Sequence, residues 1–262
     1  MTILFTSDLD KTLIFSKRRL LEGEDYKLIE EIEGRPISYM SEQTFNMLVK
    51  LNEQIVFIPV TTRSLEQYRR LTCFQQEILP QVEIVSNGGI VFNNGVRDEN
   101  WDAHIAQQMK NLFVSLEMIP KFAFPVFNAP FVESIHLMDD LFYLLKVDEH
   151  AITAQVITEL KKLLVQAEWT CHLQRNKLYI LPKFLTKGAA VAYIKSTFIH
   201  SVHAAAGDST MDLSMLKLAD FMYIPAHAEI AELGDDDLNA SFNESYSDFS
   251  NKLLSAIDAM VE

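Results

Sequence analysis

The chain has 262 residues, of which 48% are hydrophobic, and its formal net charge at pH 7 is −13. This length allows one large domain or two modest ones, and the apolar content is ample for a packed core. The negative charge argues against nucleic acid as a partner, because binding to a phosphate backbone depends on clustered Lys and Arg. No stretch approaches the roughly 18 consecutive apolar residues of a membrane span, so we expect no membrane partner.

The two cysteines, Cys73 and Cys171, lie far apart in the sequence and show no metal-ligand spacing. Buried free thiols are therefore expected, and a zinc site is not. No basic region followed by an apolar run precedes the first predicted strand, so a signal peptide is not expected. Together these features predict a cytoplasmic protein.

The first part of the chain predicts alternating strands and helices. Residues 3–5 form an apolar strand, residues 26–40 two extended segments around a turn, and a helix follows a cap at Ser41. Residues 55–60 predict a second buried strand, which completes the rhythm of a βαβ unit with a parallel sheet. Residues 83–92 predict a strand, a tight Asn-Gly turn and a return strand.

The middle of the chain predicts a different order of helices and strands. Helical apolar spacing covers residues 101–116 and 151–167. Four short strands are predicted at residues 132–138, 142–147, 170–174 and 177–181. Helix, two strands, helix, two strands is typical of an α+β sheet with helices on one face.

The last part returns to alternating elements. The predicted elements are a helix from Lys187, a strand from Val202, a helix near residues 211–218, a strand at 221–224 and a helix from Asp248, with a solvated acidic loop at 235–237. We therefore predict an α/β fold, a Rossmann-like three-layer core with a parallel sheet and an inserted α+β domain. The core comprises residues 1–97 and 183–262, and the insert residues 98–182.

Polar motifs follow four of the core segments. They are Asp8-Leu9-Asp10-Lys11-Thr12-Leu13, Thr61-Thr62-Arg63-Ser64, Lys187 within Leu185-Thr186-Lys187-Gly188-Ala189-Ala190, and Gly207-Asp208-Ser209-Thr210-Met211-Asp212. Open α/β sheets bind ligands at the carboxyl ends of their strands, so we expect these motifs to meet there.

Four carboxylates would converge at this edge of the sheet: those of Asp8, Asp10, Asp208 and Asp212. Such a cluster facing an anionic substrate would be electrostatically untenable without a cation. Carboxylate oxygens together with a substrate phosphate are what Mg²⁺ prefers. The sequence therefore implies Mg²⁺ as the cofactor.

The ordered set of motifs resembles the haloacid dehalogenase superfamily, and the position of the insert resembles the type IIB cap of its sucrose-phosphatase-like and mannosyl-phosphoglycerate-phosphatase-like members. The Ser86-Asn87-Gly88-Gly89 turn before the insert is similar to theirs. The resemblance implies that Asp8 is a nucleophile that forms an aspartyl-phosphate. It also implies that Asp10 is the general acid and base.

The same resemblance implies the remaining site residues. The metal ligands would be Asp8, Asp208 and the main-chain carbonyl of Asp10, with Asp212 in a supporting role. Thr61 and Lys187 would bind the transferring phosphoryl oxygens. Further substrate contacts are predicted at Thr62, Arg63, Asn87 and Gly88, although Arg63 could instead form a structural ion pair. The seven histidines are read as surface or internally bonded side chains.

Two positions depart from the superfamily pattern. Thr62 stands where Gly is frequent, and Met211 where type IIB members usually have Asn. We predict a Mg²⁺-dependent phosphatase that acts on a small phosphorylated metabolite, a sugar phosphate by analogy. The alternatives are a phosphomutase of the same superfamily or, in view of Met211, a catalytically weak binding or regulatory protein. Substrate identity and oligomeric state stay open.

Overall fold

The computed structural model describes residues 2–230 and 244–261, so the acidic run at 235–237 lies outside them. The chain divides into two compact units. The core unit comprises Met1–Asp98 and Thr186–Glu262, and the inserted unit Glu99–Leu185. The first boundary was expected after residue 97 and the second after residue 182.

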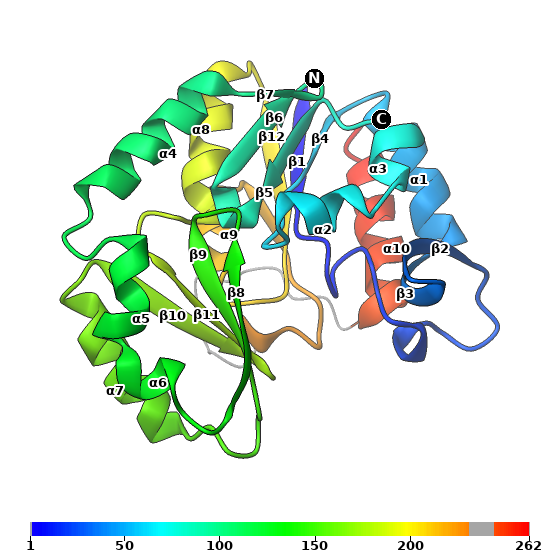
Figure 1. The fold of residues 1–262 in the computed structure, drawn as a ribbon. Coiled ribbons are helices and arrows are strands. Elements are labelled where there is room, and N and C mark those ends of the chain that lie inside the picture. Colours follow the sequence, from blue (N-terminus) through cyan, green and yellow to red (C-terminus); the bar gives the residue numbers. More distant parts are fainter. Residues whose placement is uncertain (1, 231–243, 262) are drawn as a thin grey trace. The chain divides into compact units, whose positions relative to one another are not determined.

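A four-stranded parallel sheet forms the centre of the core unit (Figure 1). Its strand order is β13 (Phe221–Tyr223), β12 (Val202–Ala206), β1 (Ile3–Ser7) and β4 (Val56–Pro59). All five residues of β1 are buried, because a parallel strand between two helical layers has no solvent face. The continuous apolar run at the start of the chain therefore becomes the middle of the sheet.

A second, antiparallel sheet continues from the first through a parallel bridge between Val60 and Ile84. It contains β5 (Val82–Val85), β6 (Ile90–Asn93) and β7 (Val96–Arg97). The turn between β5 and β6 is the short 3₁₀ segment η2 (Ser86–Gly88). This arrangement confirms the predicted strand, tight turn and return strand.

Helices cover the central sheet on both faces. Figure 1 shows α8 (Lys187–Thr197) on one side and α1 (Glu42–Asn52) with α10 (Tyr246–Asp258) on the other. The shorter helices of this unit are α2 (Leu65–Arg69), α3 (Cys73–Gln76), α9 (Leu213–Leu216) and the 3₁₀ turn η1 (Lys17–Arg19). The predicted α/β core with three layers is confirmed.

An antiparallel hairpin of β2 (Tyr26–Ile32) and β3 (Arg35–Ser41) follows the first motif. Its turn places Glu33 and Gly34 at positive φ, 50° and 74°, as two-residue hairpin turns require. Ser41 ends the hairpin and caps α1, because its side chain accepts a hydrogen bond from the Thr44 N–H. Both features were predicted from the sequence.

The inserted unit is an antiparallel sheet with helices, as expected. The strand order is β10 (Trp169–Gln174), β11 (Lys177–Pro182), β9 (Phe142–Val147) and β8 (Val132–Met138). The helical segments are α4 (Glu99–Asn111), η3 (Leu116–Met118), α5 (Ile119–Phe122), α6 (Phe124–Phe127) and α7 (Ala154–Val165).

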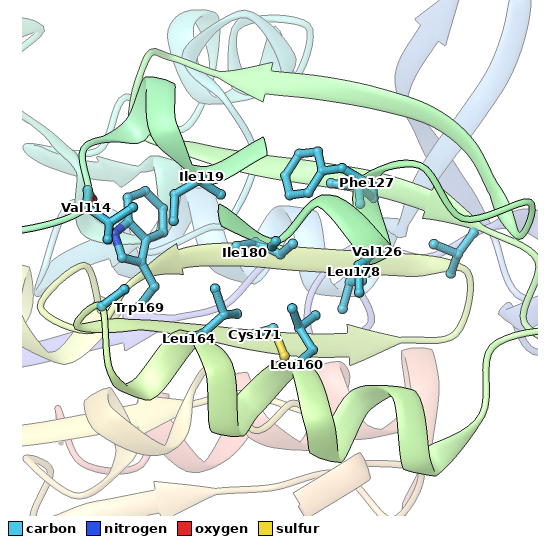
Figure 2. Close-up of a cluster of buried hydrophobic side chains, with 14 of the residues drawn as sticks. Val114, Ile119, Val126, Phe127, Leu160, Leu164, Trp169, Cys171, Leu178 and Ile180 are labelled. Carbon is cyan, nitrogen blue, oxygen red and sulfur yellow. Dashed lines mark hydrogen bonds between the residues drawn. The ribbon is translucent and has the colours of Figure 1, made fainter. Parts of the chain in front are cut away.

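The inserted unit has its own hydrophobic core (Figure 2). Leu160 and Leu164 of α7 point toward the strands that carry Cys171 and Ile180. Trp169 is fully buried in this cluster, and its indole N–H donates to the Val114 carbonyl at 2.9 Å. The free thiol of Cys171 is buried here, and that of Cys73 is buried in the core unit, as expected.

Two predicted helices are shorter than their apolar spacing suggested. The helix expected over 101–116 ends at Asn111, since the N–H of Leu112 bonds to the Met109 carbonyl three residues back rather than four. The helix expected near 211–218 is only Leu213–Leu216, because the N–H groups of Leu218 and Ala219 bond to carbonyls three residues back rather than four. Of the helices described, none has the length and hydropathy that crossing a membrane would need.

Candidate active site

Asp8 and Asp208 stand at the ends of two neighbouring strands. Asp8 directly follows β1, and its N–H donates to the carbonyl of Ala206, the last residue of β12, at 2.9 Å. Asp208 follows two residues later on that strand's exit loop. Both side chains are buried. The parallel pairing of β1 and β12 therefore brings the first and fourth motifs together, as predicted.

Lys187 joins two of the acids. Its Nζ lies 2.5 Å from Asp8 Oδ1 and 2.5 Å from Asp212 Oδ1. Burial alone would lower the pKa of Lys187, but the charges of Asp212 and Asp8 outweigh it and leave the pKa raised. Lys187 is the first residue of α8, whose N-cap is Thr186. The start of the helix thus fixes the backbone position of Lys187, which is 1% exposed.

Asp212 is held almost entirely by protein groups. Its Oδ2 accepts from the Ser209 N–H at 2.9 Å, the Ser209 hydroxyl at 2.8 Å and the Asp208 N–H at 3.2 Å. A Cβ at Gly207 would lie 2.5 Å from the Cβ of Asp212, so only glycine allows this loop to fold over the carboxylate. Both carboxylate oxygens of Asp212 therefore have partners within the protein.

One carboxylate oxygen from each of Asp8, Asp208 and Asp212 lies within 4.8 Å of the other two. Burial raises the pKa of Asp8, Lys187 lowers it, and the charges of the neighbouring acids raise it again, so that the pKa stays well above its usual value. Burial also raises the pKa of Asp208 to about 6, partly offset by Lys11, whose Nζ lies 3.4 Å away. This excess of negative charge on hard oxygen donors fits a divalent cation such as Mg²⁺.

The Asp10 side chain is not part of this group of three, although its charge is close enough to contribute to the raised pKa of Asp8. Arg63 binds the Asp10 carboxylate, with Nε 2.7 Å from Oδ2 and Nη2 2.8 Å from Oδ1. The third branch of the guanidinium, Nη1, donates to Glu30 Oε2 at 2.8 Å. Arg63 thus forms the structural ion pair that the sequence left open as an alternative to a substrate contact.

Thr61 lies on the side of β1 opposite to β12 and is fully buried. It follows β4, and its hydroxyl accepts from the Arg63 N–H at 3.1 Å. Its carbonyl accepts from the Asn87 N–H at 2.9 Å, which ties the turn η2 to the second motif. The neighbouring Thr62 has no positive φ, so the β-branched residue at the usual glycine place carries no backbone strain there.

Gly88 serves the backbone rather than presenting a side chain. Its φ is +95°, and a Cβ there would lie 2.4 Å from the carbonyl oxygen of Thr186. The turn between β5 and β6 therefore packs directly against the residue that precedes Lys187. Asn87, also at positive φ (56°), is 2% exposed.

Three contributors to this region were missed by the sequence analysis. Lys11 approaches Asp208, Ser209 holds Asp212, and Glu30 holds Arg63. Lys11 and Ser209 lie inside the motifs and could have been found there. Glu30 lies on β2 and has no local signal, because its charged partners come from another part of the chain.

The histidines of this unit follow the structural expectation. His203 is fully buried, with Thr6 Oγ1 2.9 Å from its Nε2 and the Leu218 carbonyl 3.1 Å from its Nδ1. Burial lowers the pKa of His203 to about 4. His227 is hydrogen-bonded to the Lys11 carbonyl and the Tyr246 N–H. Neither forms part of the carboxylate group.

Residues 1–226 match the family described as sucrose-6F-phosphate phosphohydrolase. The chain belongs to this family, within the haloacid dehalogenase superfamily. It is therefore a phosphatase, a phosphoric monoester hydrolase. The sequence has no significant match among curated proteins.

Solved structures of similar fold include the sucrose-phosphatase of Synechocystis sp. PCC6803 in complex with sucrose and phosphate. It is 13% identical with a TM-score of 0.70, over 98% of this chain and 97% of that one. A haloacid dehalogenase-like hydrolase from Bacillus subtilis is 15% identical with a TM-score of 0.57, over 98% and 92%. The trehalose-6-phosphate phosphatase of Aspergillus fumigatus is 14% identical with a TM-score of 0.55, over 98% and 93%. At these identities the likeness shows the fold.

Membership of this family decides among the three functions that the sequence suggested. A phosphatase is favoured over a phosphomutase or a binding protein without turnover. Met211, the residue on which the hypothesis of a binding protein was based, is only 4% exposed. The substitution therefore places a buried apolar side chain next to Asp212.

Proposed function

We propose that this chain hydrolyses a sugar phosphate in a Mg²⁺-dependent reaction through an aspartyl-phosphate on Asp8. The observation that carries the proposal is the buried group of Asp8, Asp208 and Asp212 at the carboxyl ends of β1 and β12, in which Lys187 bridges Asp8 and Asp212. Uncatalysed hydrolysis of a phosphate monoester is extremely slow, and a carboxylate nucleophile divides it into two easier steps.

Asp8 attacks the phosphorus atom and the leaving alcohol departs from it. Lys187 and Thr61, both buried beside β1, stabilise the negative charge on the phosphoryl oxygens. Water then attacks the phosphorus of the acyl-phosphate, which releases inorganic phosphate and regenerates the Asp8 carboxylate. Lys187 starts within 2.5 Å of Asp8, so its charge is in place at the first step.

The carboxylates of Asp8 and Asp208 and the main-chain carbonyl of Asp10 would hold Mg²⁺. Asp212 would help to orient these ligands, since its oxygens accept hydrogen bonds from Lys187 and from the loop at residues 208–209. The ion, when bound, neutralises part of the negative charge of the acids and of the substrate phosphate.

Asp10 transfers the protons in this proposal. As an acid it protonates the leaving alcohol, and as a base it activates the water that attacks the acyl-phosphate. It is two residues from the nucleophile, and 47% of its side chain is exposed, so it is accessible to a substrate. Substrate contacts by Thr62, Asn87 and Gly88 stay predictions of the sequence; for Gly88 only the backbone is available.

The substrate class comes from the relatives. The family is described by the hydrolysis of sucrose-6F-phosphate, and the Synechocystis sucrose-phosphatase is bound to sucrose and phosphate. We propose that the inserted unit, Glu99–Leu185, is the type IIB cap and selects among sugar phosphates. The motif residues would contact only the phosphoryl group and the metal, which all such substrates share.

The test is a panel of phosphate esters incubated with the protein and Mg²⁺, with release of inorganic phosphate as the readout. Sucrose-6F-phosphate, trehalose-6-phosphate, simple hexose phosphates and 4-nitrophenyl phosphate form the panel. Preferred hydrolysis of a sugar phosphate supports the proposal. Isomerised sugar phosphate without release of phosphate would identify a phosphomutase, and saturable binding without turnover a regulatory protein. A cytoplasmic location stays a prediction.

A further inference from the structure

A chain of charged side chains runs from Asp10 into the hairpin β2–β3. Arg63 binds Asp10 along one edge of its guanidinium and Glu30 with Nη1. The other carboxylate oxygen of Glu30 accepts from Arg70 Nε at 3.0 Å. The hydroxyl of Ser38 adds a third donor, at 3.1 Å from Glu30 Oε2. All five residues belong to the core unit.

Glu30 is the buried centre of this network, with 2% of its side chain exposed. Burying a carboxylate is costly unless charged and hydrogen-bonding partners compensate. Two arginines and a hydroxyl compensate it here, yet a well-packed apolar residue at such a place is often as stable as a buried ion pair. The network is therefore better explained by the geometry it imposes than by stability.

The hairpin is distorted at Glu30. Pairing between β2 and β3 shifts register between Leu28 and Glu30 and again between Glu30 and Glu31. Ile29 and Glu30 are consecutive buried residues in a strand whose side chains should alternate between faces. A β-bulge re-aims a side chain in this way and is found frequently beside active sites. The bulge turns Glu30 inward to Arg63.

Arg63 passes this constraint on to Asp10. Only 11% of the Arg63 side chain is exposed, whereas 47% of the Asp10 side chain is exposed, so packing alone does not fix the acid. A guanidinium is a rigid planar fork, and anchoring Nη1 at Glu30 fixes the direction of the Nε and Nη2 donors. The two parallel hydrogen bonds then set the plane of the Asp10 carboxylate.

We propose that Glu30 is a positioning residue for proton transfer by Asp10 and acts on it through Arg63. The inference rests on the proposed function of Asp10 as general acid and base. It also assigns Arg63 to Asp10 rather than to the substrate phosphate.

The readout is the dependence of the rate on the leaving group. A sugar alcohol leaves as an unstable alkoxide unless Asp10 donates a proton as the bond from phosphorus to oxygen breaks. A 4-nitrophenolate leaves without a proton. A fault confined to the positioning of Asp10 therefore slows sugar phosphates selectively, whereas a general loss of structure or metal slows both. Values of kcat/KM are compared, because they cover the steps up to departure of the leaving group.

The variant is Glu30→Gln, which keeps the shape of the side chain but removes its charge and presents an amide to one arginine. General acid–base catalysis contributes about 10²–10⁴-fold, so a misplaced acid should lower kcat/KM for sucrose-6F-phosphate about tenfold. The value for 4-nitrophenyl phosphate should change by less than about twofold. Glu31→Gln, the same change at the exposed neighbouring residue, should leave both values unchanged.

A double-variant cycle tests the route through Arg63. Arg63→Lys removes the fork and should show the same selective loss. If Glu30 acts through Arg63, the double variant should be no slower than Arg63→Lys alone. Additive losses would overturn the inference.

Other outcomes also decide the matter. A loss of equal size on both esters, or no loss on the sugar phosphate, would overturn the role of Glu30. Should Glu30→Gln fail to fold, Ser38→Ala removes one donor to Glu30 and should give a smaller loss with the same selectivity; an unselective loss there would count against the inference. Wild-type protein that hydrolyses neither ester would instead overturn the proposed function.

Discussion

The two units of the chain differ in what they bury. In the core unit the buried side chains include Asp8, Glu30, Lys187, Asp208 and Asp212 together with several hydroxyl groups. Within Glu99–Leu185, all of whose residues are described, no charged side chain is buried, and the buried side chains are aliphatic, sulfur-containing or aromatic, among them Trp169 and Tyr179. The core unit thus carries a large electrostatic cost that the inserted unit avoids.

This difference separates chemistry from packing. Buried charges are retained where something binds to them or reacts with them, because they contribute little to stability. An apolar cluster such as that around Trp169 contributes stability and no chemistry. We therefore expect variants in the core-unit cluster to change turnover more than stability, and variants in the inserted core to do the opposite.

The largest effect is expected from Asp8→Asn. An amide cannot form an acyl-phosphate, so turnover should fall by more than about 1,000-fold. The fold should be kept, since burial raises the pKa of Asp8 and a neutral amide removes a buried charge. Turnover and the thermal midpoint are measured together. Asp140→Asn, the same change at an exposed turn of the inserted unit, is the control and should retain full activity. Substantial turnover by Asp8→Asn would show that another group is the nucleophile.

Removal of the metal should have a comparable effect on turnover. Activity should vanish with EDTA, return with Mg²⁺ and be weak with Ca²⁺, whose looser coordination misplaces the nucleophile. Binding to the folded state should also raise the thermal midpoint of the wild-type protein with added Mg²⁺. Asp208→Asn should remove this increase. Undiminished activity in chelator would contradict the metal assignment.

A cavity in the inserted core should give the reverse pattern. Leu164→Ala removes a fully buried side chain from the cluster and should lower the free energy of unfolding by about 2–5 kcal/mol. Hydrolysis of 4-nitrophenyl phosphate by the folded variant should be unchanged, because the carboxylate group belongs to the other unit. Val165→Ala, at the 54% exposed neighbouring position, should cost less than about 0.5 kcal/mol. Urea unfolding measures both.

The smallest effect concerns His203. Its pKa is lowered from 6.5 to about 4 by burial, so between these values the unfolded chain binds a proton that the folded protein does not. His203 therefore makes stability fall as the pH falls from about 6.5 to 4, by at most about 3–4 kcal/mol. His203→Asn should remove this part of the slope, measured as the difference from wild type in urea unfolding at several pH values. His136→Asn, at an exposed strand position, should leave the slope unchanged.

Local patterns predicted most of the fold. The apolar run of β1, the cap at Ser41 and the turn at Glu33–Gly34 each depend on neighbouring residues, and each was confirmed. The helix end at Asn111 was not predicted, and the Val114 carbonyl beyond it accepts from the indole of Trp169, 55 residues away, a contact that apolar spacing cannot reveal.

The site divides in the same way. The meeting of Asp8 with Asp208 follows from two motifs at the ends of parallel strands, which the sequence displays. The contacts of Arg63 with Asp10 and Glu30 instead join three separate segments of the chain, and Glu30 lies at a register shift of the hairpin. A register shift leaves no signature in composition or periodicity, so this part required the structure.

The position of Lys187 between Asp8 and Asp212 has a consequence for the order in which charge moves. In the proposed reaction the carboxylate of Asp8 loses its charge when it is esterified, and the phosphoryl group brings new negative charge to almost the same place. The ammonium group of Lys187 is also held by Asp212 at 2.5 Å, so it can pair first with the Asp8 carboxylate and then with the phosphoryl group without moving. Lys187 would thus act as a stationary counter-ion. Because Asp212 holds it in place before the substrate binds, no reorganisation of this charge would be needed during turnover.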